Sequence, residues 1–269
     1  MQLLIGFLLG ALIGFASLKA RALSLSGALA ATLTGGLIFG LGGVPWAVLL
    51  LTFFITSSAL SRAFKRQKAS LNEKFAKGSQ RDWGQVLANG GLGALLAVAY
   101  GLVPQSNWVW ITFAGAMAAV NADTWSTELG VLSAIPPRLV SNGKVVERGT
   151  SGGITPLGTL SALAGSALVG ILAATFSPGD RFWGTWGIVS LGGLAGALFD
   201  SLLGATVQGI YYCPVCQKET ERHPRHLCGA ETRHVRGWRW LNNDLVNFAC
   251  SGMGALVSFL VWRLFLAMQ

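Results

Sequence analysis

The chain has 269 residues, of which 52% are hydrophobic and only 12% are charged, and its formal net charge is +9. Because a soluble globular domain carries about 25% charged residues, this composition excludes a soluble domain. We assign the excess positive charge to membrane topology and to an anionic ligand, and we expect no nucleic-acid partner.

Apolar segments recur along the chain, each close to the roughly 20 residues that a helix needs to cross a bilayer. We predict eight of them, at 2–18, 23–41, 44–61, 84–103, 108–122, 156–176, 183–208 and 243–266. The fifth is the shortest and the second is rich in glycine. Residues 1–269 are therefore predicted to form a single all-α integral membrane domain with about eight transmembrane helices.

The positive charges predict the orientation of these helices. Of the 20 Lys and Arg residues, 18 fall in four loops, at 19–22, 62–83, 123–155 and 209–242. Eight helices place these loops on one side of the membrane, which the positive-inside rule assigns to the cytoplasm. Both termini are then predicted outside, in the plasma (inner) membrane, with the active site facing the cytoplasm. The basic stretch 61–81 is interpreted as a topology loop on anionic headgroups, with attraction of nucleotide or lipid phosphate as the alternative.

Glycines inside the predicted helices indicate close helix packing. Gly6, Gly10 and Gly14 form two overlapping GxxxG steps, and Gly192 with Gly196 forms another. This spacing lets helix backbones approach each other in lipid, where no hydrophobic drive brings helices together.

Acidic residues occur near the predicted cytoplasmic ends of three helices, where a charge inside the membrane costs about 2.5–3.5 kcal/mol. "NADTWSTELG" contains Asp123 and Glu128, "LFDSLLGATVQ" contains Asp200, and "LNNDLVNF" contains Asp244. Carboxylates that converge from three helices predict a Mg²⁺ site made by these four residues. Structural roles remain open, with Glu128 as a surface residue at a helix end and Asp244 as a first-turn acid behind an asparagine cap.

A glycine- and hydroxyl-rich loop follows the first acidic stretch. It begins with the cations Arg138, Lys144 and Arg148, and it continues with Gly149, Thr150, Ser151, Gly152 and Gly153. Glycines let backbone N–H groups turn toward an anion, and the positive end of the sixth helix points at this loop. The combination of metal, cations and backbone donors is typical of phosphoryl transfer. The chain has no GxxxxGK[ST] pattern, which excludes a P-loop ATPase.

The loop at 209–241, predicted to be a cytoplasmic insertion between the last two helices, contains "CPVCQKETERHPRHLCG". Cys213 and Cys216 form a CxxC pair, and Cys228 follows twelve residues later. This spacing predicts a structural Zn²⁺ site with three Cys ligands and one His ligand, for which His226 is the first choice among the three histidines. A redox pair or a loop without metal are the alternatives.

Four motifs taken together identify a family resemblance. "NADTWSTELG", "PRLVSNGKVVERGTSGGITPLGT", "GGLAGALFDSLLGATVQ" and "WLNNDLVNF" resemble the membrane family known as domain of unknown function 92, and "RDWGQVLANGG" at 81–91 fits the same pattern. That family includes vertebrate transmembrane protein 19 and a plant phytyl-phosphate kinase, and the resemblance covers nearly the whole chain. The acidic stretch with Asp123 and Glu128 and the glycine loop that follows it are also similar to the nucleotide site of dolichol kinases.

The resemblance implies a membrane-embedded kinase that transfers a phosphoryl group from CTP, or another nucleoside triphosphate, to an isoprenoid or phytyl monophosphate. The residues that match the family's shared motifs are Asp123, Glu128, Lys144, Gly149, Thr150, Gly152, Gly153, Asp200 and Asp244. Within this scheme we assign catalytic roles to Asp123, Asp200, Lys144, Arg138 and Arg148, and nucleotide binding to Lys144, Gly149, Thr150, Ser151, Gly152 and Gly153. Gln85 and Asn89 are assigned to the lipid head group. The plant enzyme has an acidic residue where this chain has Ser151, so the substrate and nucleotide preferences can differ.

Two other functions remain open at the level of sequence. A CTP-dependent cytidylyltransferase acting on a lipid phosphate would use the same acids and cations, but it would release pyrophosphate. A cation-coupled transporter or flippase would use the acids for coupling, with a site expected nearer the middle of the membrane. The partners implied by the first two functions are a nucleoside triphosphate, a lipid phosphate and membrane lipid.

Overall fold

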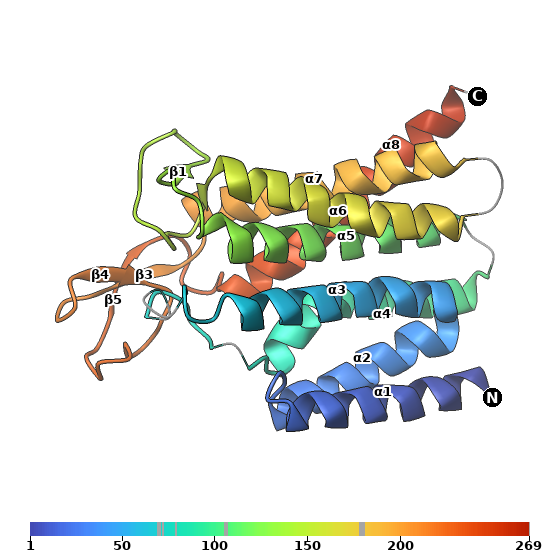
Figure 1. The fold of residues 1–269 in the computed structure, drawn as a ribbon, viewed down its shortest axis with the longest axis horizontal. Coiled ribbons are helices and arrows are strands. Elements are labelled where there is room, and N and C mark those ends of the chain that lie inside the picture. The colour runs from blue at the N-terminus through green and yellow to red at the C-terminus, as the bar shows by residue number, and fades with distance from the viewer. Residues whose placement is uncertain (69–70, 72, 79, 105–106, 178–180, 269) are drawn as a thin grey trace.

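Long helices lie side by side and form one bundle in the computed structural model, which describes residues 1–269 except 69–70, 72, 79, 105–106, 178–180 and 269 (Figure 1). Within the described residues the helices are α1 (Gln2–Lys19), α2 (Leu25–Gly42), α3 (Val44–Ala63), α4 (Trp83–Leu102), α5 (Asn107–Gly130), α6 (Pro156–Thr175), α7 (Phe182–Thr206) and α8 (Asn243–Ala267). The prediction of a helical membrane protein with about eight helices is confirmed. Both termini lie at the same end of the bundle, and which side of the membrane they face stays a prediction.

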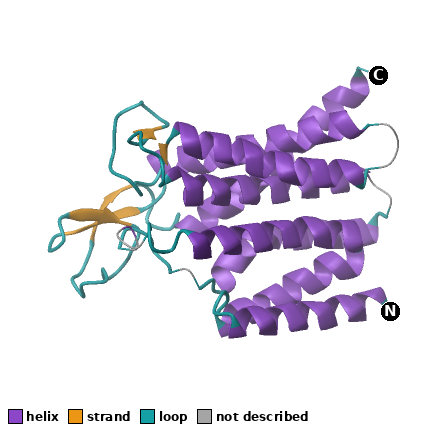
Figure 2. Cartoon of the chain, viewed as in Figure 1, coloured by secondary structure: helices purple, strands orange, loops and turns teal. Residues whose placement is uncertain are grey.

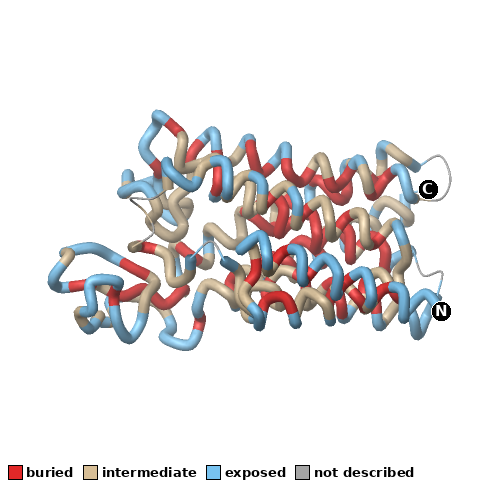
Figure 3. The backbone as a smooth tube through the Cα atoms, turned by 60° about the horizontal axis from the view of Figure 1, so that its bottom comes forward, coloured by how far each residue is buried: buried red, intermediate tan, exposed pale blue. Residues whose placement is uncertain are grey.

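Helix α5 differs from the other seven in composition. In the part of the chain that the structure describes, the other seven are long and apolar enough to cross a membrane, whereas α5 is less apolar. It packs against α3, α4, α6, α7 and α8, and its side chains from Val109 to Ala122 are buried almost without a break. Figure 3 shows this concentration of buried residues in the middle of the bundle. A helix enclosed by protein needs less apolar surface than one that faces lipid.

The glycine steps bring helix backbones together as predicted. In α1 only Gly6, Gly10, Gly14 and Ser17 are buried, and a Cβ added to Gly6 would lie 2.7 Å from the carbonyl oxygen of Gly36 in α2. The glycine stripe of α1 therefore lies against the backbone of α2, and the side chains of Leu3 and Phe7 lie over Gly40 and Gly36 of α2.

Among the described residues, five short strands occur at the end of the bundle opposite the termini (Figure 2). β1 (Arg138–Leu139) pairs with β2 (Gly153–Ile154), and β3 (Ile210–Cys213), β4 (Lys218–Thr220) and β5 (Arg233–Arg236) form a sheet in the order β4-β3-β5. The all-α prediction omitted these strands, because each is only two to four residues long and lies in a loop between helices. They give the 123–155 and 209–242 loops a fixed shape.

Helices α2, α4, α6 and α8 begin at this strand-bearing end. Each has a side-chain N-cap, formed by Ser24, Asp82, Thr155 and Asn242 respectively. In α4 the cap is a full capping box with Gln85. The N-terminal ends of helices carry partial positive charge, so several of these ends face the same region. That region is suited to anions.

Candidate functional site

A polar cavity of about 880 Å³ opens at the strand-bearing end of the bundle. It is lined by most of the residues that the sequence singled out, namely Gln85, Asn89, Asp123, Glu128, Arg148, Gly149, Thr150, Ser151, Gly152, Gly153, Asp200 and Asp244. The N-terminal turns of α4, α6 and α8 also contribute to its wall. Segments that are far apart in the sequence therefore form one cavity.

Asp123 of α5 and Asp200 of α7 form the acidic centre of this cavity. Their carboxyl groups are close enough to repel each other electrostatically. Among the described residues, neither carboxylate has a basic partner, and the buried Oδ2 atom of Asp200 has no hydrogen-bond partner. Two such carboxylates are costly unless a cation lies between them. Their oxygens are the ligands that Mg²⁺ prefers, so the pair fits that ion.

Glu128 and Asp244 lie in the same cavity but already have basic partners. Glu128 accepts a hydrogen bond from Ser61 Oγ at 2.7 Å and is 2.9 Å from Lys68 Nζ. Asp244 forms an ion pair with Lys77. The predicted four-carboxylate magnesium site is therefore divided, with one unpaired inner couple and two outer acids that are neutralised by lysines.

The 149–153 loop is held against the end of α7. Gly149 and Gly152 have φ angles of +78° and +82°, in the left-handed region that favours glycine. A Cβ added to Gly152 would lie 2.2 Å from the backbone nitrogen of Ala205, so only glycine allows this approach. Within the described residues, the N–H groups of Gly149 and Ser151 donate no hydrogen bond, and they remain available to an anion.

Two of the predicted cations do not line the cavity. Arg138 is exposed in β1 and Lys144 is exposed in the turn that follows it, and the guanidinium of Arg138 donates to the carbonyl oxygen of Gly143 at 2.9 Å. Their closeness to the glycine loop in sequence suggested a shared site, but the β1–β2 pairing carries the intervening turn away from it. Arg148 does line the cavity, where its guanidinium also donates to the carbonyl oxygen of Ser133 at 2.6 Å.

Sequence reasoning missed several cations that do line the cavity. They come from the 62–83 and 209–242 loops and include Lys65, Lys68, Lys77, Arg81, Arg225 and Arg239. Residues 62–83 contain seven Lys and Arg residues, and because topology loops carry the same residue types, the sequence did not single out those that line the cavity. The alternative interpretation of this stretch, attraction of phosphate, agrees with its position.

Arg81 belongs to this cation group. Its guanidinium donates to Ser57 Oγ at 2.9 Å and lies 5.5 Å above the centre of the Phe53 ring. Burial lowers the pKa of Arg81, and the charge of Glu128 offsets only part of that effect. A partly buried cation that is incompletely neutralised is suited to an anionic ligand.

A second, apolar cavity of about 280 Å³ lies between α1, α2, α3 and α4. It shares four lining residues with the polar cavity, namely Phe53, Arg81, Gln85 and Asn89. Gln85 and Asn89, which were assigned to the lipid head group, thus lie at the junction between a polar and an apolar space. Such a junction matches a ligand with a charged head and an apolar tail.

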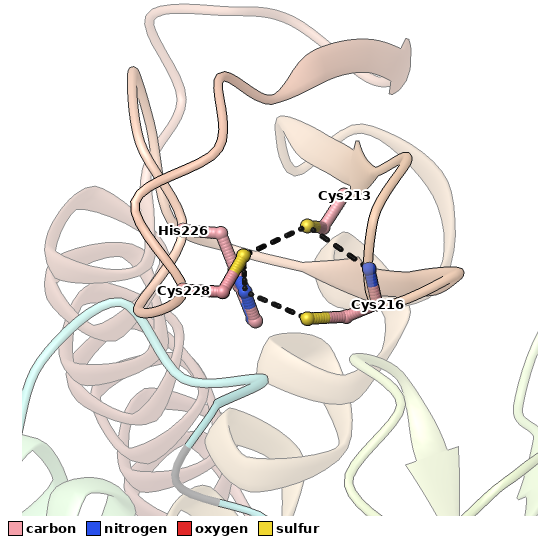
Figure 4. A group of neighbouring side chains, drawn as sticks. All are labelled: Cys213, Cys216, His226 and Cys228. Atoms are coloured by element: carbon pink, nitrogen blue, oxygen red, sulfur yellow. Dashed lines mark hydrogen bonds between the residues drawn. The ribbon is translucent and has the colours of Figure 1, made fainter.

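The cysteine loop forms a third cluster, next to the polar cavity. The ligand atoms of Cys213, Cys216, His226 and Cys228 lie within 4.8 Å of one another, and all four side chains converge on one point (Figure 4). His226 is the histidine that joins the cysteines, as the sequence suggested.

Comparison with known proteins places the chain among membrane proteins. The family model described as "Integral membrane protein DUF92" matches residues 8–255. The chain is 35% identical to Protein PGR of Arabidopsis thaliana, over 92% of this chain and 91% of that protein. It is 35% identical to the membrane protein MJ0933 of Methanocaldococcus jannaschii, over 70% of this chain and 75% of the relative.

A more distant similarity extends to a chloroplast protein. Protein VTE6, chloroplastic, of Arabidopsis thaliana is 25% identical over 91% of this chain and 66% of that protein. No solved structure matches the chain significantly.

Proposed function

The chain belongs to the DUF92 family of integral membrane proteins, and from this premise we propose that it is a membrane-embedded kinase acting on a lipid phosphate. The donor is a nucleoside triphosphate, with CTP as the first candidate, and the acceptor is an isoprenoid or phytyl monophosphate. The family motifs and the distant similarity to Protein VTE6 support this choice of chemistry.

One observation carries the proposal, namely that the polar and apolar cavities meet at Arg81, Gln85 and Asn89. A nucleotide fits the polar cavity, with its phosphates near the 149–153 loop. A prenyl chain fits the apolar space between α1 and α4. The lipid phosphate then lies at the junction, beside the Arg81 guanidinium.

The proposed reaction requires no covalent catalysis by the protein. A phosphate oxygen of the lipid attacks the γ-phosphorus of the nucleotide, the bond from that phosphorus to the β–γ bridging oxygen breaks, and the nucleoside diphosphate leaves. The acceptor phosphate is ionised at neutral pH, so no strong general base is required. Positioning and charge neutralisation are the main sources of rate in such a transfer.

The protein groups have defined roles in this scheme. Asp123 and Asp200 would hold Mg²⁺, which neutralises the β- and γ-phosphates when bound. The N–H groups of Gly149 and Ser151 donate to phosphate oxygens, and Arg148 neutralises charge at the cavity wall. Burial of the acceptor in an apolar space beside the site explains why the catalyst is built from membrane helices.

The position of Asp200 argues against a transporter. Asp200 lies about two turns before the end of α7, on the wall of a cavity at one end of the bundle. It neighbours Asp123 rather than standing alone in the middle of the membrane. A coupling site would be expected near the midplane.

The test is a transfer assay on the purified protein in detergent. The protein is supplied with Mg²⁺, CTP or ATP labelled at either the γ- or the α-phosphate, and phytyl, geranylgeranyl or undecaprenyl monophosphate. We expect γ-label in a lipid diphosphate. α-Label in the lipid, with release of pyrophosphate, would instead identify a cytidylyltransferase. The absence of both transfer and nucleotide binding at millimolar concentration would refute both enzyme hypotheses.

The apolar cavity gives a prediction about acceptor binding. Val48 lines this cavity, and the larger side chain of Val48→Trp would occupy part of it, so we expect the KM for the prenyl phosphate to rise by about tenfold or more while the KM for the nucleotide is unchanged. Val98→Trp on the exposed side of α4 is the matched control and should behave as wild type. Equal effects of the two substitutions, measured by initial rates, would show that the prenyl tail does not bind in this cavity.

We further propose that the polar cavity faces the cytoplasm, because the basic loops lie at its end of the bundle. In a bacterial inner membrane, we expect alkaline phosphatase fused to the C-terminus to be active and a fluorescent protein fused there to be dark. The reverse pattern would place the cavity on the outer side.

A further inference from the structure

We propose that Cys213, Cys216, His226 and Cys228 bind one structural Zn²⁺ ion, and that this ion fixes the loop that borders the polar cavity. The inference rests on the arrangement of these four side chains. It holds whether or not the protein is a kinase, because it concerns how the loop folds.

The geometry of the cluster is that of a tetrahedral zinc site. Cys213 Sγ and Cys228 Sγ are 3.6 Å apart, and His226 Nδ1 is 3.5 Å from Cys216 Sγ and 3.3 Å from Cys228 Sγ. Zn–S bonds of about 2.3 Å and Zn–N bonds of about 2.0–2.1 Å in a tetrahedron require separations of about 3.8 Å and 3.5 Å. The side chains therefore already surround a space of the size that zinc occupies.

The orientation of His226 supports a metal in preference to a disulfide. Its Nε2 atom is 3.2 Å from the carbonyl oxygen of Glu73, which requires the proton on Nε2. Nδ1 then carries the free lone pair, and it faces the sulfur atoms. An outer hydrogen bond of this kind is what orients metal-binding histidines. The cysteines are unpaired, and one more thiol is present than a disulfide would use.

Four protein ligands leave no open position, so the site would be structural and not catalytic. Cys213 ends β3, Cys216 lies in the turn before β4, and His226 and Cys228 lie in the loop between β4 and β5. One ion would thus join the two halves of a loop that has few buried apolar side chains of its own. The sheet alone, with strands of three and four residues, offers little stability.

The loop held in this way reaches the polar cavity through Glu221. The Glu221 carboxylate accepts hydrogen bonds from Ser151 Oγ at 2.8 Å and from Gln208 Nε2 at 2.9 Å. Its second oxygen accepts from the backbone N–H of Ala76 at 3.2 Å. Burial raises the pKa of Glu221, and these hydrogen bonds act in the opposite direction. Glu221 therefore links the glycine loop, the end of α7 and the basic 62–83 loop.

The same basic loop is bound by β4, which lies in the chain between the proposed zinc ligands Cys216 and His226. Thr220 Oγ1 donates to the carbonyl oxygen of Glu73 at 2.8 Å, Glu221 N donates to that of Lys74 at 2.8 Å, and Lys218 forms an ion pair with Glu73. Loss of the ion would release these contacts together. Glu221 is then a positioning residue, which acts on a phosphate ligand only through Ser151.

The first experiment measures metal in the full-length protein, purified in detergent without chelators, by mass spectrometry of the elements. We expect about one zinc per chain. Cys213→Ser and His226→Ala should lose it during purification. Cys250→Ser and His223→Ala are the matched controls and should keep it, because Cys250 is buried in α8 and His223 stacks on Tyr211 outside the cluster. Wild-type protein without zinc, or zinc loss in the controls with retention in His226→Ala, would overturn the assignment.

A second measurement does not depend on substitutions that could prevent folding. Wild-type protein is treated with a chelator that prefers zinc to magnesium, in excess Mg²⁺, and is digested briefly with trypsin. We expect cleavage at Lys218, Arg222 and Arg225 only after zinc removal, and protection to return when zinc is added back. Unchanged protection after complete zinc removal would overturn the role of the ion in fixing the loop.

Discussion

Substitution of Asp200 by asparagine is expected to lower kcat for phosphoryl transfer by about 10³-fold, the scale of loss when a charge is removed from such a site. Asp123→Asn should have a similar effect. Because both carboxylates would hold the same ion, the double variant should be little worse than either single variant. Initial rates at saturating nucleotide and lipid measure these losses.

The same substitution is expected to lower kcat but to raise the thermal stability of the protein. Among the described residues neither Asp123 nor Asp200 has a basic partner, so removal of one of these charges should raise the Tm of the protein without Mg²⁺. The added Tm that wild type gains from Mg²⁺ should vanish in the variant. Glu231→Gln, an exposed acid outside the cavity lining, is the control and should behave as wild type in both assays. Retention of wild-type kcat in both aspartate variants would refute the metal-binding pair.

Substitution of Gly152 by alanine is expected to lower kcat/KM for the nucleotide by about 10²-fold, since small displacements of positioning groups have effects of this size. The added Cβ would lie 2.2 Å from the backbone nitrogen of Ala205, and a helix backbone cannot move aside. The 149–153 loop must then leave α7, which moves its N–H donors away from the cavity.

Gly143→Ala separates steric overlap from backbone strain. Gly143 has φ +71°, close to the +82° of Gly152, but no atom would lie within 4 Å of its added Cβ. The strain of a left-handed alanine, about 1–2 kcal/mol, is therefore common to both variants, whereas the clash is confined to Gly152. Thermal unfolding and nucleotide titration compare the two. Equal losses of activity would show that contact between the loop and α7 is irrelevant to function.

The fold could be predicted from the sequence because hydropathy and the distribution of positive charge both indicate where the membrane helices begin and end. Lipid-facing helices must be apolar, and basic loops gather on one side, so helix number and the common position of the loops followed from composition. The boundary that differed most was the end of α5, predicted at 122 and observed at Gly130. Hydropathy signals contact with lipid, and the last turns of α5 contact protein and the polar cavity instead.

The candidate site was only partly accessible from the sequence. Asp123 and Asp200 could be found because a carboxylate within an apolar membrane helix is energetically costly and therefore indicates a function. Lys68, Lys77 and Arg81 could not be separated from topology charges, which have the same sign and occupy the same loops. Glu221 gave no signal at all, since its role arises from the path of the cysteine loop across the cavity.

The enclosure of α5 has a consequence for biogenesis. This helix carries Asn121 and Asp123, and each charged residue near the centre of an isolated helix raises the cost of insertion by about 2.5–3.5 kcal/mol. Its surroundings include α6, α7 and α8, which the ribosome makes later. On leaving the translocation channel, α5 would therefore lack the neighbours that later cover its polar groups. Its stable integration therefore depends on the C-terminal half of the chain. A chain truncated after α5 should lack α6, α7 and α8 and should also fail to hold α5 stably in the membrane.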